Sequence, residues 1–463
     1  MHVHLIGIGG TGLSAIAKVL LERGFTVTGS DRVYSDLVKA VESVGAQVFI
    51  GHNSKNITGA DFIVRSSAVP DDNVEVLAAK KAGIPVHKRA DFLHNLTKDY
   101  KVIAVAGTHG KTTTTSMLAW MLTELHQDPS YIVGGVVNNL GTNAHAGKGT
   151  WFVIEADEYD RMFLGLKPDI AIITNIEHDH PDIFPEPTDF ELAFRDFTAC
   201  VKENGVIIGC GDNPPTVRLL EDMAVKNVEI LQYGIDPHRN TYWAEDVALK
   251  ENRTGYEFNF MKKQEYVTHV SLQIPGKHNV ANALAALSVI DKMSLSVKKA
   301  ANILSTFSGA ERRFDIRGES KGITIIDDYA HHPTEIKTTI QATKTRYPEH
   351  ELWVVWQPHT FSRILKFYAQ FIDAFQDANH LVITNVYAAR EKRPRGFSIA
   401  KFVDDINHLD KRYIPEFSEV IEYLLARMQP RDIVLVLSAG DAVRMSEKLY
   451  ETLRDEQGDI SSS

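Results

Sequence analysis

The stretch Lys101 to Thr115, KVIAVAGTHGKTTTT, decides how the rest of the chain is interpreted. Its first six residues, 101–106, are apolar after Lys101 and rich in β-branched side chains, which predicts a strand. Gly107 and Gly110 allow a tight turn, and the residues from Thr112 onward predict a helix. The backbone N–H groups at that helix start and the Lys111 ammonium would bind phosphate, and the Thr112 hydroxyl would bind Mg²⁺. The stretch is typical of a phosphate-binding loop; a glycine-rich turn with an incidental lysine is the weaker alternative.

The composition fits a globular enzyme of several domains. The chain has 463 residues, of which 24% are charged and 44% hydrophobic. This length exceeds one hydrophobic core, and we expect three domains. The net charge of −10 argues against nucleic acid as the main ligand.

The sequence carries no sign of export. It does not begin with a basic stretch followed by an apolar one, and it has no apolar run long enough to span a membrane. Cys200 and Cys210 lack a metal-binding spacing. We therefore expect a cytoplasmic protein without membrane insertion.

Residues 1–98 alternate strand and helix patterns. A strand at 3–8 runs into GIGGTG at 7–12 and a helix at 13–23, and the next strand ends at Ser30-Asp31. An acid about twenty residues after the glycines is the dinucleotide-binding pattern, which by itself predicts NAD. The same turn would also hold the pyrophosphate of a UDP-sugar. A third possibility is that the glycines serve only helix-on-sheet packing.

Two acidic segments directly follow apolar strand patterns in the middle of the chain. Residues 151–154 lead into EADEYD at 155–160, and residues 169–174 lead into NIEHDH at 175–180. Carboxyl ends of parallel strands share one edge of a sheet, so both segments should face the phosphate loop. Oxygen ligands and an imidazole beside a triphosphate predict Mg²⁺. A solvated acidic face is the alternative for each segment.

The remaining patterns complete an α/β fold of three domains. Residues 228–274 alternate as in antiparallel sheet, and a helix follows in which Asn279 and Asn282 would bind adenine or, for Asn279, simply cap the helix. Strands at 322–326, 352–356, 381–384 and 433–437 predict a further doubly wound sheet. We expect a Rossmann-like N-terminal domain at 1–98, a central P-loop ATPase-type domain with an antiparallel sheet at 99–311, and a Rossmann-like C-terminal domain at 312–463.

Eight motifs together resemble the Mur ligases. They are GIGGTG, GTHGKTTTT, EADE, NIEHDH, PGKHNVANALAA, GAERRF, DDYAHHPTE and QPHTFSR, in that order along the chain. The phosphate loop has the family's G-T-x-G-K-T-[ST] pattern, in which the first glycine lies two residues closer to the lysine than in other P-loops. The chain is most similar to the subgroup that joins L-alanine to UDP-N-acetylmuramate. A neighbouring subgroup, which uses a murein tripeptide, typically has EADEYD, and Tyr159 occupies that position here.

The resemblance implies ligands and site residues. The ligands would be ATP, Mg²⁺, UDP-N-acetylmuramate and L-alanine, bound by a monomer or homodimer. The UDP-sugar site would contain Gly9, Gly10, Thr11, Gly12, Asp31, Ser66 and Ser67. The ATP site would contain Gly107, Thr108, Gly110, Lys111, Thr112, Thr113, Asn279, Asn282, Arg313 and Asp328. Thr112, Glu155 and His180 would bind the metal, and Tyr329, His331 and Arg363 the amino acid. The catalytic set would be Lys111, Glu155, His180, His331, His359 and Arg363.

The implied reaction is amide-bond formation in peptidoglycan precursor synthesis. The lactyl carboxylate would take the γ-phosphoryl group of ATP, and the amine of L-alanine would then displace phosphate from the acyl phosphate. Many relatives carry an arginine where this chain has Thr360, so that cationic contact would be missing or come from Lys88, Arg89 or Arg390. The competing functions are a murein tripeptide ligase, an NAD-dependent oxidoreductase and a non-catalytic P-loop module.

Overall fold

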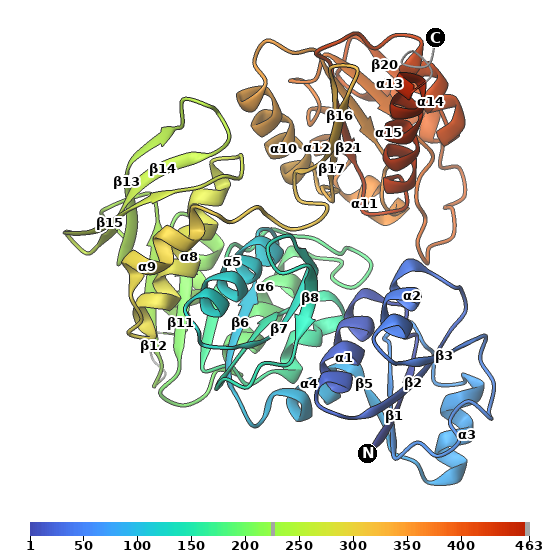
Figure 1. The fold of residues 1–463 in the computed structure, drawn as a ribbon, viewed down its shortest axis with the longest axis vertical. Coiled ribbons are helices and arrows are strands. Elements are labelled where there is room, and N and C mark those ends of the chain that lie inside the picture. The colour runs from blue at the N-terminus through green and yellow to red at the C-terminus, as the bar shows by residue number, and fades with distance from the viewer. Residues whose placement is uncertain (224–226, 459–463) are drawn as a thin grey trace.

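Three β-sheets follow one another along the chain in the computed structural model, which describes residues 1–223 and 227–458. Each sheet with its helices forms one unit: N-terminal (2–97), middle (101–304) and C-terminal (315–458). Figure 1 shows the N-terminal unit beside the middle unit and the C-terminal unit above them. The three-domain α/β architecture is as predicted. The domain limits expected after residues 98 and 311 fall in the connections between sheets, and they stay predictions. Residues 459–463 of the expected third domain lie outside the described part of the chain.

The N-terminal sheet has the strand order of a Rossmann-like domain. Its five parallel strands are ordered β3-β2-β1-β4-β5. The order reverses beside β1, so the crevice at the carboxyl ends of β1 and β4 is where such a sheet binds ligands. The strands are β1 (His2–Ile6), β2 (Thr26–Asp31), β3 (Gln47–Ile50), β4 (Phe62–Arg65) and β5 (Val86–Lys88), and the helices are α1 (Thr11–Glu22), α2 (Asp36–Ser43), α3 (Val74–Ala82) and α4 (Arg89–Thr97).

The middle sheet has ten strands, with β6 (Lys101–Ala106) at its centre between β9 (Trp151–Glu155) and β10 (Ile170–Ile173). All three run parallel. The phosphate loop between β6 and α5 (Lys111–Glu124) and both acidic segments therefore lie at one sheet edge, as the sequence predicted. Beyond them lie β7 (Ser130–Val137), β8 (Thr142–His145), β11 (Val206–Cys210) and β12 (Glu229–Gly234).

The antiparallel strands continue this same sheet. β13 (Tyr242–Leu249), β14 (Tyr256–Lys262) and β15 (Glu265–Ser271) extend it beyond β12. β12, which begins inside the stretch predicted to be antiparallel, pairs in parallel with β11. The helical elements of the unit are η1 (Tyr159–Gly165), α6 (Pro187–Thr198), α7 (Pro214–Met223), α8 (His278–Lys292) and α9 (Val297–Leu304).

The C-terminal sheet is parallel except at one edge. Its order is β16-β17-β21-β18-β19-β20, and only β16 (Asp315–Ser320) pairs antiparallel. The other strands are β17 (Ile323–Asp328), β18 (Leu352–Trp356), β19 (His380–Ile383), β20 (Lys411–Tyr413) and β21 (Ile433–Leu437). The helices are α10 (Pro333–Arg346), α11 (Phe361–Lys366), α12 (Tyr368–Ile372), α13 (Ile399–Asp405), α14 (Phe417–Leu425) and α15 (Val443–Gly458).

The N-terminal and middle units share one continuous apolar core. Leu20 of α1 and Leu96 of α4 belong to the same buried cluster as Phe163 of η1. Helix α4 packs so closely on η1 that a Cβ on Gly165 would lie 1.9 Å from the carbonyl oxygen of Ala90. Among the helices that the structure describes, none is long and apolar enough to cross a membrane.

Candidate active site

The phosphate loop is held by its two predicted glycines and by the second acidic segment. Gly107 and Gly110 have φ of +139° and +83°, where other residues are strained. The Thr108 N–H donates to the Asn175 carbonyl and the Thr108 hydroxyl to the Glu177 carbonyl, at 3.0 and 2.8 Å. The loop thus enters α5 with Gly110 as its N-cap and with no side chain capping the first turn.

Lys111 is held in a buried carboxylate and carbonyl cage. Its Nζ donates to the carbonyl oxygens of Gly107 and Thr108 at 2.5 and 3.0 Å and to Glu158 at 3.0 Å. Burial alone would lower the pKa of Lys111, but Glu158 and Glu155 outweigh burial and raise it, so the ammonium stays charged. Glu158 is 1% exposed and also lies 3.4 Å from His180 Nε2. The sequence prediction left Glu158 out, although it lies in the acidic segment that was singled out.

The predicted metal ligands lie in two neighbouring groups: Thr112 contacts Glu155, whereas His180 contacts other acids. Thr112 Oγ1 donates to Glu155 Oε1 at 3.1 Å, and the Gly134 N–H donates to Glu155 Oε2 at 2.8 Å. His180 is turned toward Glu158 and Asp179. Both groups surround the Lys111 end of the loop. A hydroxyl, a carboxylate and an imidazole at a phosphate loop are a donor set that suits Mg²⁺ with bound phosphates, so the residues present fit the ion.

A second group has metal-like spacing but different chemistry. His109, Glu177 and His332 bring their ligand atoms within 4.8 Å of one another. His109 Nε2 lies 2.9 Å from Glu177 and its Nδ1 lies 3.1 Å from Glu335. Burial opposes the charge on His109, but these two carboxylates raise its pKa to about 9. Both ring nitrogens of His109 are thus engaged by carboxylates, so this group is an ionic cluster.

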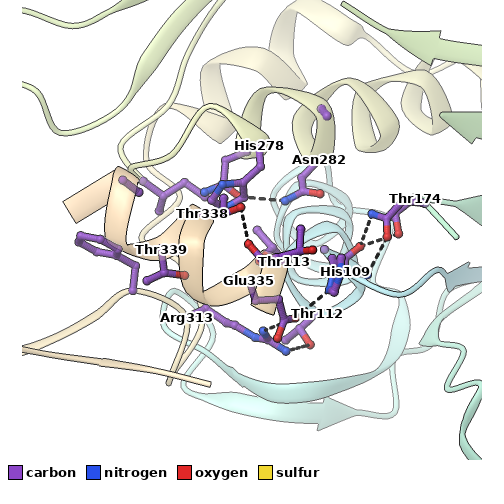
Figure 2. Close-up of a pocket in the computed structure, with 18 of the residues that line it drawn as sticks. His109, Thr112, Thr113, Thr174, His278, Asn282, Arg313, Glu335, Thr338 and Thr339 are labelled. Carbon is purple, nitrogen blue, oxygen red and sulfur yellow. Dashed lines mark hydrogen bonds and ion pairs between the residues drawn. The ribbon is translucent and has the colours of Figure 1, made fainter. Parts of the chain in front are cut away.

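A cavity of about 360 Å³ opens beside the loop, between the middle and C-terminal units. Figure 2 shows Thr112 and Thr113 of α5, His278 and Asn282 of α8, and Glu335, Thr338 and Thr339 of α10 around it. The residues that line it include seven of the predicted ATP-binding residues: Gly110, Thr112, Thr113, Asn279, Asn282, Arg313 and Asp328. The sequence prediction missed the contribution of α10, because a helix of another unit leaves no local signal of where it docks.

The two predicted adenine-binding amides are buried and bonded within the protein. Asn279 Nδ2 donates to the Pro275 carbonyl at 2.7 Å, and Asn282 Nδ2 donates to Asn279 Oδ1 at 2.9 Å. A Cβ on Gly110 would lie 2.4 Å from Asn282 Oδ1. Asn279 therefore fixes the turn that enters α8, although the N-cap of that helix is Lys277. Asn282 packs directly on the phosphate loop.

Arg313 and Asp328 connect the C-terminal unit to the cavity. Arg313 Nη2 donates to Thr112 Oγ1 at 3.4 Å. Asp328 accepts from the backbone N–H groups of Phe314 and Ala330 at 2.7 and 2.8 Å. Burial raises the pKa of Asp328 to about 6 despite the nearby Arg313. Asp328 thus shapes the two loops that carry Arg313 and Tyr329.

Asp179, which was not predicted, lies among the remaining residues of the predicted catalytic set. The Nε and Nη2 atoms of Arg363 both lie 2.9 Å from Asp179 Oδ1, and Arg363 is 2% exposed. Burial alone would raise the pKa of Asp179, but Arg363 holds it well below its usual range. The guanidinium fork that the sequence assigned to the amino acid is engaged with a carboxylate of the protein itself.

Two imidazoles lie beside this pair, His331 near Asp179 and His359 near Arg363, and Tyr329 packs against His331. His331 Nδ1 lies 2.9 Å from the Tyr329 carbonyl oxygen, and the His331 and His359 rings are 5.6 Å apart. Burial lowers the pKa of His331 to about 4 and also lowers that of His359. Both imidazoles are neutral at pH 7. Tyr329 stacks under Arg313 at 5.2 Å.

The predicted UDP-sugar residues gather at the carboxyl ends of β1, β2 and β4. Asp31 Oδ2 accepts from the Gly9 N–H at 2.9 Å, so this acid braces the glycine turn. Gly10 is the N-cap of α1, which begins at Thr11. A Cβ on Gly7 would lie 3.1 Å from Ser66 Cβ, which places Ser66, followed by the exposed Ser67, beside the turn. Gly12 contacts Arg89, whose Nη2 lies 3.4 Å from Asp157 of the middle unit.

Comparisons with known proteins agree along nearly the whole chain. Residues 2–101 match "Mur ligase family, catalytic domain", residues 105–290 "Mur ligase middle domain" and residues 312–440 "Mur ligase, glutamate ligase domain". The chain is similar to the UDP-N-acetylmuramate--L-alanine ligases of Roseiflexus sp. (strain RS-1), 41% identical over 98% of this chain and 100% of that one, and of Caldanaerobacter subterraneus subsp. tengcongensis, 39% identical over 97% of each.

Two solved structures resemble the fold as a whole. The UDP-N-acetylmuramate-alanine ligase of Thermotoga maritima has a TM-score of 0.84 and 26% identity, with 98% of this chain and 100% of that one covered. A murein peptide ligase of Psychrobacter arcticus has a TM-score of 0.74 and 25% identity, with 98% of each chain covered.

Proposed function

This chain belongs to the Mur ligase family, and from that premise we propose that it joins L-alanine to the lactyl carboxylate of UDP-N-acetylmuramate with ATP. The proposal places it in peptidoglycan precursor synthesis in the cytoplasm. Its curated relatives carry the alanine ligase name at 37–41% identity over almost the full chain. The NAD-dependent oxidoreductase that the glycine pattern alone suggested does not fit this family.

The two-sided cavity supports a phosphoryl-transfer ligase over a non-catalytic P-loop module. Thr112 lines a cavity whose opposite wall, with Arg313 and Glu335, comes from another unit. Lys111 precedes Thr112 in the chain, and Glu155 accepts a hydrogen bond from the Thr112 hydroxyl. A nucleotide in that cavity would contact both units at once. A non-catalytic P-loop module would not need the cationic and imidazole groups that the C-terminal unit brings to this edge.

The chain's residues have distinct roles in the first half-reaction. The N–H groups at the start of α5 and the Lys111 ammonium bind the ATP phosphates and stabilise negative charge on the transferred group. Thr112, Glu155 and His180 would hold Mg²⁺, which supplies further positive charge. A lactyl carboxylate oxygen attacks the γ-phosphorus as the bond to the bridging oxygen breaks, giving an acyl phosphate and ADP.

The second half-reaction needs a free amine. The nitrogen of L-alanine attacks the acyl carbon, the proton of the attacking amine is lost, and phosphate leaves. His331 is neutral and donates from Nδ1 to the Tyr329 carbonyl, so its Nε2 can accept a hydrogen bond from the ammonium form of alanine. His359 Nδ1 already accepts from Arg363, so its Nε2 carries the proton and can donate. With a pKa of about 4, His331 is a weak base. We assign both imidazoles to orientation of the acceptor.

Phosphate release tests the proposal directly. Release from Mg·ATP should require UDP-N-acetylmuramate and L-alanine together. The same assay with glycine, L-serine and a murein tripeptide as acceptors tests the alternative of a tripeptide ligase, which the presence of Tyr159 suggests. Release that does not depend on the sugar nucleotide and acceptor contradicts a ligase, and a higher kcat/KM for the tripeptide contradicts the alanine assignment.

A further inference from the structure

An arginine of α4 lies directly against the glycine turn of the N-terminal unit. A Cβ added to Gly12 would lie 1.7 Å from Arg89 Nη1 and 2.8 Å from Arg89 Cζ. Gly12 is the second residue of α1, a helix of 12 residues with no side-chain cap and no acid in its first turn. The guanidinium and the unpaired N–H groups of that turn therefore form one positive region.

Arg89 has few partners for a shielded guanidinium. Its side chain is 19% exposed, and its one ion pair with a described residue is that with Asp157 at 3.4 Å, close to the limit of a hydrogen bond. Its Nε is buried and finds no hydrogen-bond partner among the described residues. Burial lowers the pKa of Arg89, which is the signature of a cation that is poorly compensated. A second acceptor on this side chain would relieve the deficit.

A second arginine reaches the same place from the C-terminal unit. Arg390 lies on the loop between β19 and α13, which is visible in Figure 1 as a long orange loop descending from that unit. Its guanidinium lies 6.0 Å from the centre of the Tyr159 ring, two residues after Asp157. The loop is anchored by Glu391, which accepts from the Ser362 N–H at 2.9 Å and from its hydroxyl.

These two guanidinium groups repel each other across Asp157 and Tyr159. Arg390 is near enough that its charge contributes to lowering the pKa of Arg89. Asp157 of the middle unit, 3.4 Å from Arg89, and the nearby Asp160 offset part of this charge, but burial outweighs them. Two cations brought together by separate units are most stable with an anion between them, and guanidinium groups bind phosphates and carboxylates in bidentate fashion.

We propose that Arg89 and Arg390 form a two-domain clamp on the anionic part of the sugar nucleotide, with Arg89 on the diphosphate and Arg390 closing over the substrate from the C-terminal unit. This inference rests on the proposed function. It supplies the cation that Thr360 leaves missing from the QPHTFSR segment. It also makes closure of the C-terminal unit depend on the sugar nucleotide as well as on ATP.

Calorimetric titration without ATP tests the clamp. The ligands are UDP, UDP-N-acetylglucosamine and UDP-N-acetylmuramate, of which only the last has a lactyl carboxylate. Arg89→Gln should weaken binding of all three by a similar factor of about 10 to 100, the range for hydrogen bonds to a charged group. Arg390→Gln should weaken the binding of UDP-N-acetylmuramate. If this variant binds UDP and UDP-N-acetylglucosamine equally weakly, Arg390 contacts the diphosphate. If it binds those two ligands as wild type does, Arg390 contacts the lactyl carboxylate.

Two controls keep the result specific. Arg395→Gln changes an exposed arginine of the same loop and should leave all three affinities unchanged. Arg89→Lys keeps the positive charge but loses the bidentate guanidinium. It should therefore weaken the binding of all three ligands while the unfolding temperature stays that of wild type. Unchanged affinities in the folded Arg89 and Arg390 variants, or an equal loss in Arg395→Gln, would overturn the clamp. If wild type binds UDP-N-acetylmuramate but does not ligate it, the proposed function fails and the clamp stands.

Discussion

The middle unit meets its two neighbours in opposite ways. Toward the N-terminal unit the contact is a continuous apolar core, with Leu96 and Phe163 2% and 0% exposed. Toward the C-terminal unit the contacts are ionic and surround a cavity, as in the Arg363–Asp179 and His109–Glu335 pairs. An apolar contact is insensitive to small ligands, whereas an ionic contact around a cavity changes when charged ligands enter. We infer that the first two units move together and that the third opens and closes.

The connection between the middle and C-terminal units agrees with this difference. Asn139 of the β7–β8 hairpin accepts from the Ser308 N–H at 2.8 Å, and its Nδ2 donates to the Thr306 carbonyl at 2.8 Å. This amide-rich hairpin thus holds the chain as it leaves the middle unit. The Glu311 N–H still bonds to the Val136 carbonyl at 2.9 Å. The residues just after 311 are therefore the natural hinge.

The largest expected effect is on the apolar contact. Leu96→Ala should lower the free energy of unfolding by about 2 to 5 kcal/mol, because it removes buried methyl groups and leaves a cavity. Urea denaturation measures this loss. Leu365→Ala, at a leucine that is 51% exposed, is the control and should change stability by less than about 0.5 kcal/mol. If Leu96→Ala folds but has a much lower kcat, the apolar contact between the N-terminal and middle units would also serve catalysis, which contradicts this comparison.

Lys111→Ala should have the largest effect on the ionic side. It removes the cation at the transferred phosphoryl group, and loss of such a contact lowers kcat by about 10² to 10³. Initial rates of phosphate release give kcat. The protein should stay folded, because His180 still faces the buried Glu158. Near-normal turnover would show that the loop is only structural.

Glu155→Gln should raise the Mg²⁺ concentration needed for half-maximal activity by about tenfold or more, since it removes an anionic oxygen ligand. Titration of activity with MgCl₂ measures the change. Asp160→Asn removes a charge from the exposed end of the same acidic segment and serves as the control. Equal Mg²⁺ requirements in the two variants would mean that Glu155 is not a ligand.

The smallest expected effect concerns pH and the His109 cluster. His109 has a pKa of about 9, above the usual 6.5. Its pairing with Glu177 and Glu335 therefore stabilises the folded protein fully below about pH 6.5 and is lost as the pH rises through 9. The unfolding temperature of His109→Gln should fall below that of wild type at pH 6 and approach it near pH 10. His269→Gln, at an exposed histidine, should show no such trend. A constant difference at all pH values would contradict the protonated pair.

The sequence predicted best where one strand decides the position of the residues after it. Apolar strands followed by glycines or acids placed Lys111, Glu155 and His180 at one sheet edge, because neighbouring parallel strands end together. β16 was missed because its sequence, DIRGES, has a single large apolar residue and lies at a polar edge. The ligand roles assigned to these residues stay predictions.

Local sequence determined the strand-loop-helix units, the glycines of the two strand-to-helix turns and the apolar faces that pack the sheets, because each depends on residues a few positions apart. Only the tertiary structure decided which charges meet. Glu158 holds Lys111, and Asp179 holds Arg363 across 184 residues of chain. Such pairs depend on how separate units dock, and burial then sets which of these groups stay charged. The sequence alone contains the charged residues of the cleft but not their partners.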